Sequence, residues 1–164
     1  RFLGVKKTIW LPGDPDYVTG DMTDGHIDGV CAFARPGVLL VDATRDQSSV
    51  YAQVVRENRR VLELATDAQG RKFELIELFE ATDAVDTEAE VFCASYTNFY
   101  IANGAIIMPA YGIDADKEAA AVLAKAFPGR EVVPVQINTL AHGGGGVHCI
   151  TQQQPAWPLR AVIA

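Results

Sequence analysis

The sequence lacks features that would place it in several large classes of protein. Its 164 residues contain no apolar run of the roughly 20 residues that a membrane-spanning helix needs, and the N-terminus shows no secretory signal pattern. The three cysteines, Cys31, Cys93 and Cys149, are too few and odd in number for a disulfide framework. We therefore expect free thiols, a cytoplasmic location and no membrane partner.

Positive charge is also scarce. The 14 lysines and arginines are outnumbered by 21 aspartates and glutamates, which gives a net charge of -7. Such a chain is a poor match for nucleic acid or an anionic membrane, but it suits a cationic small molecule. The composition, 49% hydrophobic and 21% charged, is that of a globular α/β domain with a real core.

An initiator methionine is missing as well, because the chain begins Arg1-Phe2-Leu3 and soon enters an apolar segment. We therefore expect a piece of a longer protein, a single partial domain over 1–164. Its pattern predicts the order strand, strand, helix, strand twice, in modules over 26–79 and 97–136 with flanking strands. Repetition every 60–70 residues or so is typical of modules set around an axis or in an array.

The first module is predicted from turn signals and hydrophobic periodicity. The Pro36-Gly37 pair separates strands over 27–35 and 38–42. Asp46 offers an N-cap for a helix to Ala65, with an apolar face that includes Val50 and Val54. A strand over 73–79 then completes the module.

The second module follows an acidic connection over about 80–90. The Asn103-Gly104 pair, a strong hairpin signal, lies between strands over 98–102 and 105–109. Asp114 is expected to cap a helix to Phe127, and a strand over 131–136 follows. Two flanking strands are predicted over 7–11 and 147–151.

Cys149 is the strongest candidate for a reactive group. Four glycines over 143–146 precede it, and such a run lets the backbone approach a ligand closely. We expect Gly144 and Gly145 to shape the floor of a substrate pocket. Cys31 and Cys93 lie in apolar patterns, so they are interpreted as packing residues.

A base and a carboxylate for this thiol are found far upstream. His26 and Asp28 are two residues apart, so on a strand both would point to one face, whereas His148 would point away from Cys149. Cysteine catalysis usually joins groups that are distant in sequence. Trp10, Tyr96 and Tyr100 are interpreted as core or rim aromatics.

Four blocks of the sequence resemble the agmatine deiminases of the guanidine-modifying superfamily, which also holds bacterial-type peptidyl-arginine deiminases and amidinotransferases. They are Ile9-Trp10-Leu11-Pro12, Thr23-Asp24-Gly25-His26-Ile27-Asp28, the segment over 94–104, and the segment over 143–155 with its Gly-Gly-Gly-Gly-Val-His-Cys-Ile-Thr-Gln-Gln-Gln-Pro. The resemblance implies a pseudo-five-fold α/β propeller of ββαβ modules, of which this chain would be the C-terminal half.

The resemblance also implies the roles of the site residues. Cys149 would be the catalytic nucleophile and His26 the general acid and base. Asp28 would bind the guanidinium, and we expect Asp24, Gly144 and Gly145 to contact the substrate. The implied reaction is hydrolysis of agmatine to N-carbamoylputrescine and ammonia through a thiouronium, with no metal or cofactor and in a homodimer.

The family's other half supplies a second guanidinium-binding aspartate and a glutamate that partners the histidine. We therefore expect this chain to be inactive by itself. Three alternatives stay open: a peptidyl-arginine deiminase, a metal-dependent hydrolase, and a fragment that only binds a partner. For the metal, the ligands would be His26, Asp28, His148 and Cys149.

Overall fold

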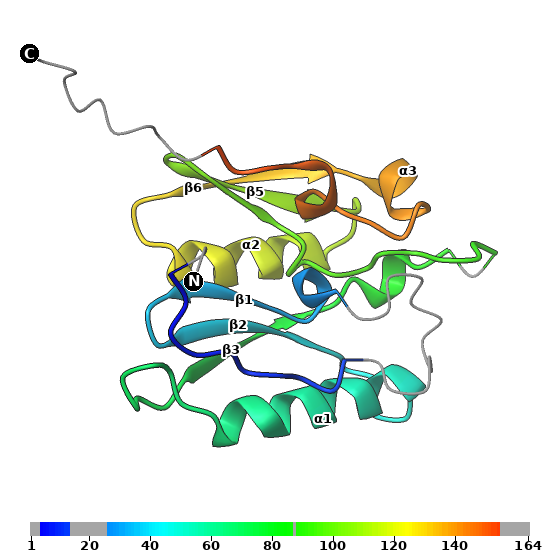
Figure 1. The fold of residues 1–164 in the computed structure, drawn as a ribbon. Coiled ribbons are helices and arrows are strands. Elements are labelled where there is room, and N and C mark those ends of the chain that lie inside the picture. Colours follow the sequence, from blue (N-terminus) through cyan, green and yellow to red (C-terminus); the bar gives the residue numbers. More distant parts are fainter. Residues whose placement is uncertain (1–3, 14–25, 87, 155–164) are drawn as a thin grey trace, which may run out of the picture.

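The frame of the molecule is formed by two small sheets and two long helices (Figure 1). The computed structural model describes residues 4–13, 26–86 and 88–154. Among these residues, no helix is long and apolar enough to cross a membrane. The two sheets and the helices together make the described part of the chain a mixed α/β structure.

The first module has the predicted order of elements: β1 (Cys31–Arg35), β2 (Val38–Ala43), α1 (Val50–Leu64) and β3 (Glu74–Phe79). In the sheet β1 is antiparallel to β2, and β2 is parallel to β3. Gly37 makes the hairpin turn possible, because its φ of +83° lies in the left-handed region. The helix then carries the chain back so that β3 can pair in parallel.

The second module repeats this topology with β4 (Tyr100–Ala102), β5 (Ala105–Ala110), α2 (Ala115–Ala126) and β6 (Glu131–Gln136). Its hairpin turns at Gly104, whose φ is +81°, as the Asn103-Gly104 pair predicts. The parallel pairs have matching registers, because the first residue of β2 faces Glu74 and the first residue of β5 faces Glu131. The modules are thus comparable position by position.

Helix α2 lies between the two sheets, while α1 covers the opposite face of the first sheet (Figure 1). Leu40 and Leu78 of the first sheet share a core with Leu123 of α2. Leu39 points the other way and packs with Leu62 of α1. Because both faces of this sheet are covered, all six residues of β2 are buried, as its continuous apolar run suggests.

Three strand predictions are wrong. Residues 7–11 and 147–151 form no strand, and the latter include a 3₁₀ turn, η4 (His148–Ile150). The strand predicted over 27–35 begins only at Cys31, because η2 (Ile27–Gly29) is also a 3₁₀ turn. Short apolar runs beside glycine do not distinguish a strand from a tight turn. The argument from strand alternation therefore fails for His26, Asp28 and His148.

Both helices are present, but their N-caps differ from the prediction. Ser49, not Asp46, caps α1, because its Oγ accepts the Ala52 N–H at 3.1 Å. Asp114 does occupy the N-cap position of α2, but its side chain makes no capping hydrogen bond. The face of α1 is also shifted, since Val54 is buried whereas Val50 is 56% exposed.

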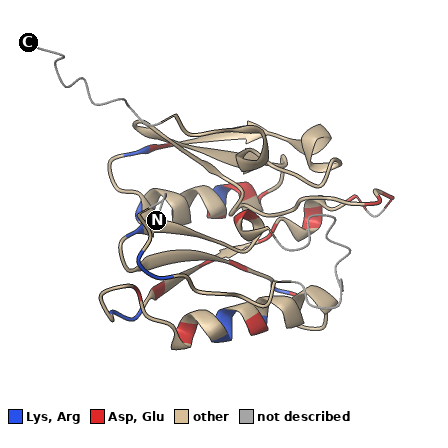
Figure 2. Ribbon diagram, viewed as in Figure 1, with Lys and Arg blue, Asp and Glu red and all other residues tan. Residues whose placement is uncertain are grey.

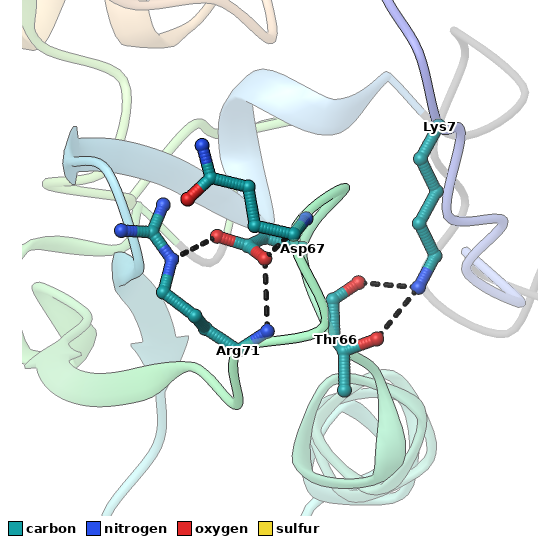
Figure 3. Close-up of polar contacts among 5 residues, drawn as sticks. Lys7, Thr66, Asp67 and Arg71 are labelled. Atoms are coloured by element: carbon teal, nitrogen blue, oxygen red, sulfur yellow. Dashed lines mark hydrogen bonds and ion pairs between the residues drawn. The ribbon is translucent and has the colours of Figure 1, made fainter.

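Residues 4–13 lie against the first module. Figure 3 shows Lys7 donating to the carbonyl and the hydroxyl of Thr66, just after α1, at 2.5 and 2.8 Å. The Thr66 loop is itself closed by Asp67, whose carboxylate accepts the Arg71 Nε at 2.6 Å and the Arg71 N–H at 2.9 Å. Trp10 is 84% exposed in this segment, so it is not a core aromatic of the described structure.

Candidate functional site

The glycine run forms a tight connection between α3 (Asn138–Ala141) and η4. Gly144 has a φ of +75°, and its N–H donates to the carbonyl of Ala141 at 2.9 Å. At Gly145 a Cβ would lie 3.1 Å from the Cys149 Cβ and 3.3 Å from its Sγ. The run therefore brings the backbone directly against the thiol, which only a residue without a side chain allows comfortably.

Three side chains from distant parts of the chain meet at Cys149. The Cys149 Sγ lies 3.2 Å from Oδ2 of Asp28, to which the thiol donates. The Asn98 Nδ2 lies 3.0 Å from the same Asp28 oxygen and 3.2 Å from the Cys149 Sγ. A thiol, a carboxylate and an amide thus lie in mutual contact.

The Asn98 amide is held in one orientation. Its Oδ1 accepts the N–H of His148 at 2.9 Å, so its NH₂ group is turned toward Asp28 and Cys149. The side chain is almost fully buried, and a Cβ at Gly146 would come within 2.6 Å of Oδ1. Because the pocket around the amide has no spare room, Asn98 is fixed while Cys149 beside it is exposed.

The surroundings of the thiol contain few charges. No lysine, arginine, aspartate or glutamate occurs over 91–113 or over 132–154, the segments that carry Asn98 and Cys149. Figure 2 accordingly shows the upper layer, with β5 and β6, as mostly uncharged. The Asp28 carboxylate contacts side chains of two segments that carry no charge of their own, and a planar cation could donate hydrogen bonds to both of its oxygens.

The other predicted site residues are placed less directly. His26 is exposed and immediately precedes η2, two residues from Asp28. Asp24 lies outside the described residues. His148 contributes its backbone N–H to the site, through the bonds to Asn98.

The remaining cysteines differ from Cys149 in their environment. Cys31 and Cys93 are partly covered, and burial raises the pKa of each thiol to about 11. Both stay protonated at neutral pH, which fits their interpretation as packing residues. Among the residues that the structure describes, no three histidine, cysteine or acidic side chains are placed to hold a metal ion.

Sequence reasoning missed Asn98. It lies in a block quoted for its resemblance, but no role was predicted for it. A signal was available, because Ser95, Thr97 and Asn98 are polar residues in a stretch without any charge, and all three are buried. Buried polar side chains need partners, and their clustering before a strand indicates a network.

Comparison with known proteins identifies the family to which this chain is similar. The family model of the Porphyromonas-type peptidyl-arginine deiminases matches residues 1–155. The chain is 42% identical to an agmatine deiminase of Medicago truncatula and 40% identical to one of Pseudomonas fluorescens, covering 94% of this chain and 46% of each relative. The structure of an Enterococcus faecalis agmatine deiminase superposes with a TM-score of 0.83 and 30% identity, over 93% of this chain and 46% of that one.

The chain thus spans about half the length of the curated relatives that it matches. The match to the family model nevertheless extends over almost all of its residues, including those that carry Asp28, Asn98 and Cys149. The chain therefore belongs to the Porphyromonas-type peptidyl-arginine deiminase family.

Proposed function

We propose that this chain carries the nucleophile and one guanidinium-binding carboxylate of an enzyme that hydrolyses agmatine to N-carbamoylputrescine and ammonia. The observation that carries the proposal is the 3.2 Å contact between the Cys149 Sγ and the Asp28 carboxylate. The names of the Medicago and Pseudomonas relatives support the choice of substrate.

Substrate binding begins at Asp28. A guanidinium is a planar cation with paired N–H groups, and a carboxylate accepts two of them side by side. In the structure, Asp28 Oδ2 accepts a hydrogen bond from the Cys149 thiol. A substrate N–H group would replace the thiol as the donor to this oxygen. Ionisation of Cys149 beside an unpaired Asp28 would place two negative charges 3.2 Å apart, and a bound cation offsets that repulsion.

In the first chemical step, the Cys149 thiol passes its proton to His26, the thiolate attacks the central guanidinium carbon, and a C–S bond forms. The tetrahedral adduct collapses as one C–N bond breaks, and His26 donates the proton with which ammonia leaves. A thiouronium remains on Cys149. His26 then takes a proton from water, the hydroxide adds to the same carbon, and the C–S bond breaks as the proton of the added hydroxyl passes to the sulfur, which gives the urea product and the thiol.

Asn98 has a supporting part in this scheme. Its NH₂ group contacts both the Cys149 Sγ and Asp28 Oδ2, so it would hold the nucleophile and the binding carboxylate next to each other. An N–H donor at 3.2 Å also stabilises negative charge that develops on the sulfur. Gly144 and Gly145 would form the floor of the pocket, and the close approach of Gly145 to the thiol supports this role.

The complete enzyme would be a pseudo-five-fold propeller, of which the two ββαβ modules are part. The chain covers less than half of its relatives, so the residues that complete the pocket would come from the other half of such a protein. Asp24 would contribute a further substrate contact. A homodimer in the cytoplasm fits the resemblance and the free cysteines of the described structure.

The experiment compares two proteins: this chain alone, and a fusion in which the N-terminal half of the Medicago truncatula relative is joined to this chain at Arg1. We expect the folded fusion to release ammonia and N-carbamoylputrescine from agmatine, and the chain alone to show almost no turnover. Cys149→Ser should abolish the activity, whereas Cys93→Ser, the matched control at a partly covered thiol, should retain it. Activity in the Cys149→Ser fusion, or none in the folded parent fusion, would contradict the proposal.

The description of the matching family favours one second candidate, a peptidyl-arginine deiminase. The same nucleophile and carboxylate would then act on an arginine side chain within a peptide. Rates of the fusion on agmatine and on a peptide with C-terminal arginine separate the two. A higher kcat/KM for the peptide would replace agmatine as the proposed substrate while leaving the chemistry at Cys149 unchanged.

A further inference from the structure

A carboxyl group is buried in the middle of the first sheet. Asp42, in β2, is only 5% exposed, and both of its neighbours along the strand, Val41 and Ala43, are buried and apolar. Its Oδ2 accepts the Tyr51 hydroxyl at 2.5 Å and its Oδ1 accepts the Ser95 hydroxyl at 2.7 Å. A buried acid costs stability unless it is fully hydrogen-bonded, so its presence calls for a reason.

The second module shows that the sheet itself does not need this group. In the matching registers of the parallel strand pairs, Asp42 faces Leu78, and Pro109 occupies the same position of β5 opposite Val135. Pro109 is fully buried and cannot form such hydrogen bonds through its side chain. An apolar residue is therefore compatible with the fold at this position.

The partners of Asp42 lead toward the site. Ser95 begins a turn that Asn98 closes, with the Asn98 N–H donating to the Ser95 carbonyl at 3.4 Å. Inside the turn, the Ser95 and Thr97 hydroxyls lie 2.6 Å apart, and the Thr97 N–H donates to the Ser95 Oγ at 3.2 Å. The first residue of the turn thus holds the acid, while the last contacts the nucleophile.

The same network also reaches the backbone of the binding carboxylate. The Thr97 hydroxyl donates to the Asp28 carbonyl at 3.3 Å, and the Asp42 N–H donates to the Val30 carbonyl at 2.9 Å. The Ser95 hydroxyl lies 3.4 Å from the carbonyl of Gly29. The Thr97 and Ser95 hydroxyls therefore hold the turn against η2, and the Ser95 hydroxyl is the one that also bonds to the Asp42 carboxyl.

We infer that Asp42 is a positioning residue for the Asp28–Cys149 pair, and that it acts through the turn over 95–98. It contacts neither the thiol nor the carboxylate itself. The inference rests on the proposed function only in treating that pair as catalytic. The residue that Asp42 would position is Asn98, whose side chain contacts both the Cys149 Sγ and the Asp28 carboxylate.

Burial raises the pKa of Asp42 to about 8, with the Tyr51 and Ser95 hydrogen bonds acting in the opposite direction. At pH 7 the carboxyl is mostly neutral, so asparagine resembles it in shape and charge. The amide oxygen could accept from Ser95, and the amide NH₂ could donate to the Tyr51 oxygen. Asp42→Asn is therefore the conservative variant, and Asp42→Leu removes both contacts.

The test is hydrogen exchange at the His148 amide, which donates to both the carbonyl and the side chain of Asn98 at 3.0 and 2.9 Å. We expect Asp42→Leu to speed this exchange at least about tenfold relative to the amides of β6, because the turn over 95–98 loses a hydrogen bond and opens locally more often. Asp42→Asn should restore protection to within roughly threefold of the parent chain. Ser95→Ala, which cuts the link but leaves Asp42 with Tyr51, should behave like Asp42→Leu.

Asn58→Leu is the matched control, because Asn58 is equally buried but bonds to Gly13 and Val54 instead of to the turn. It should lower overall stability while leaving the His148 amide as protected as β6. If Asp42→Leu does not fold, Ser95→Ala carries the test alone. Unchanged His148 protection in Ser95→Ala, or an equal loss in Asn58→Leu, would overturn the inference. Neither result depends on agmatine turnover, so the proposed function stands or falls separately.

Discussion

The two modules share topology and register but use their acidic residues differently. In the second, the Asp116 carboxylate accepts the N–H groups of Tyr111, Gly112 and Ile113 at 2.8 to 3.2 Å, and it also accepts the Tyr96 hydroxyl, 20 residues away, at 2.7 Å. In the first, Asp42 accepts hydroxyls from Tyr51 and Ser95, nine and 53 residues away. Asp116, at the start of α2, therefore mainly shapes the turn from β5 into that helix, whereas Asp42 joins β2 to α1 and to the turn over 95–98.

The comparison also locates the site. Asp28 precedes β1, Asn98 precedes β4, and Cys149 follows β6, so none of the three lies within a strand or an α-helix. The repeated sheets and helices form the frame, and the segments that enter or leave each module carry the proposed site residues. This division is common, since binding and catalytic residues are often on loops that a scaffold positions.

The largest expected effect comes from the buried acid of the first module, Asp42, and it should appear in the pH dependence of the chain's free energy of unfolding. The pKa of Asp42 is raised from 3.8 to about 8 by burial, so its favourable contribution is complete below pH 4 and is lost as pH rises to 8. The free energy of unfolding of Asp42→Asn should therefore rise relative to that of the parent chain, by up to about 4 kcal/mol between pH 5 and 8. Urea unfolding at several pH values measures this.

Asp67→Asn is the control for that prediction. Backbone and side-chain hydrogen bonds to Arg71 lower the pKa of Asp67, so its contribution is lost only as pH falls below the usual range of a carboxyl group. Between pH 5 and 8 this variant should keep the slope of the parent chain. An Asp42→Asn slope that is also unchanged would show that Asp42 is not buried in neutral form.

A smaller effect is expected where the glycine run meets the second module. In Gly146→Ala the new Cβ would lie 2.6 Å from Oδ1 of Asn98, which is buried and cannot move freely. We expect a loss of about 1–3 kcal/mol and of the Asn98 contact to Cys149, as in other overpacked sites. Thermal unfolding and exchange at the His148 amide report the two losses.

Gly29→Ala is the comparison for Gly146→Ala, because a Cβ at Gly29 would meet nothing within 4 Å and its φ is not positive. Its stability should stay within about 0.5 kcal/mol of the parent chain. Equal losses in both variants would mean that the close approach at Gly146 is not what fixes Asn98.

The smallest effect distinguishes the two helix starts. Ser49→Ala removes the hydroxyl that accepts the Ala52 N–H and should cost about 1 kcal/mol. Asp114→Ala removes a side chain that makes no capping bond, so its cost should be at most about half of that. Urea unfolding of both variants under the same conditions measures the two costs. A larger cost for Asp114→Ala than for Ser49→Ala would show that Asp114 is the stronger cap.

Much of the frame could be predicted from the sequence. The Pro36-Gly37 and Asn103-Gly104 pairs mark both hairpins, because the turns need glycine at a positive φ. Strand β6 begins and ends where its pattern predicts. Local chemistry is sufficient here, since turn residues and periodicity depend on near neighbours.

The site was less predictable, because its geometry depends on tertiary contacts. The segments at Asp28 and Cys149 form 3₁₀ turns rather than strands, and nothing within a few residues distinguishes these conformations. Asn98 was missed because its partners lie 70 and 51 positions away. The pairing of Asp28 with Cys149 was expected from the way cysteine catalysis joins groups that are distant in sequence, and from the family resemblance, but no local pattern pairs the two residues.

The central claim is that Asp28 presents a cation to Cys149, and a pair of probes tests it on the chain itself. The rates at which 2-chloroacetamidine, a planar cation, and neutral 2-chloroacetamide modify Cys149 would be followed by peptide mass spectrometry. We expect the cation to react about tenfold faster, through a charge-assisted hydrogen bond, and Asp28→Asn to remove the preference. Equal rates in the parent chain, or a preference that persists in Asp28→Asn, would contradict the account.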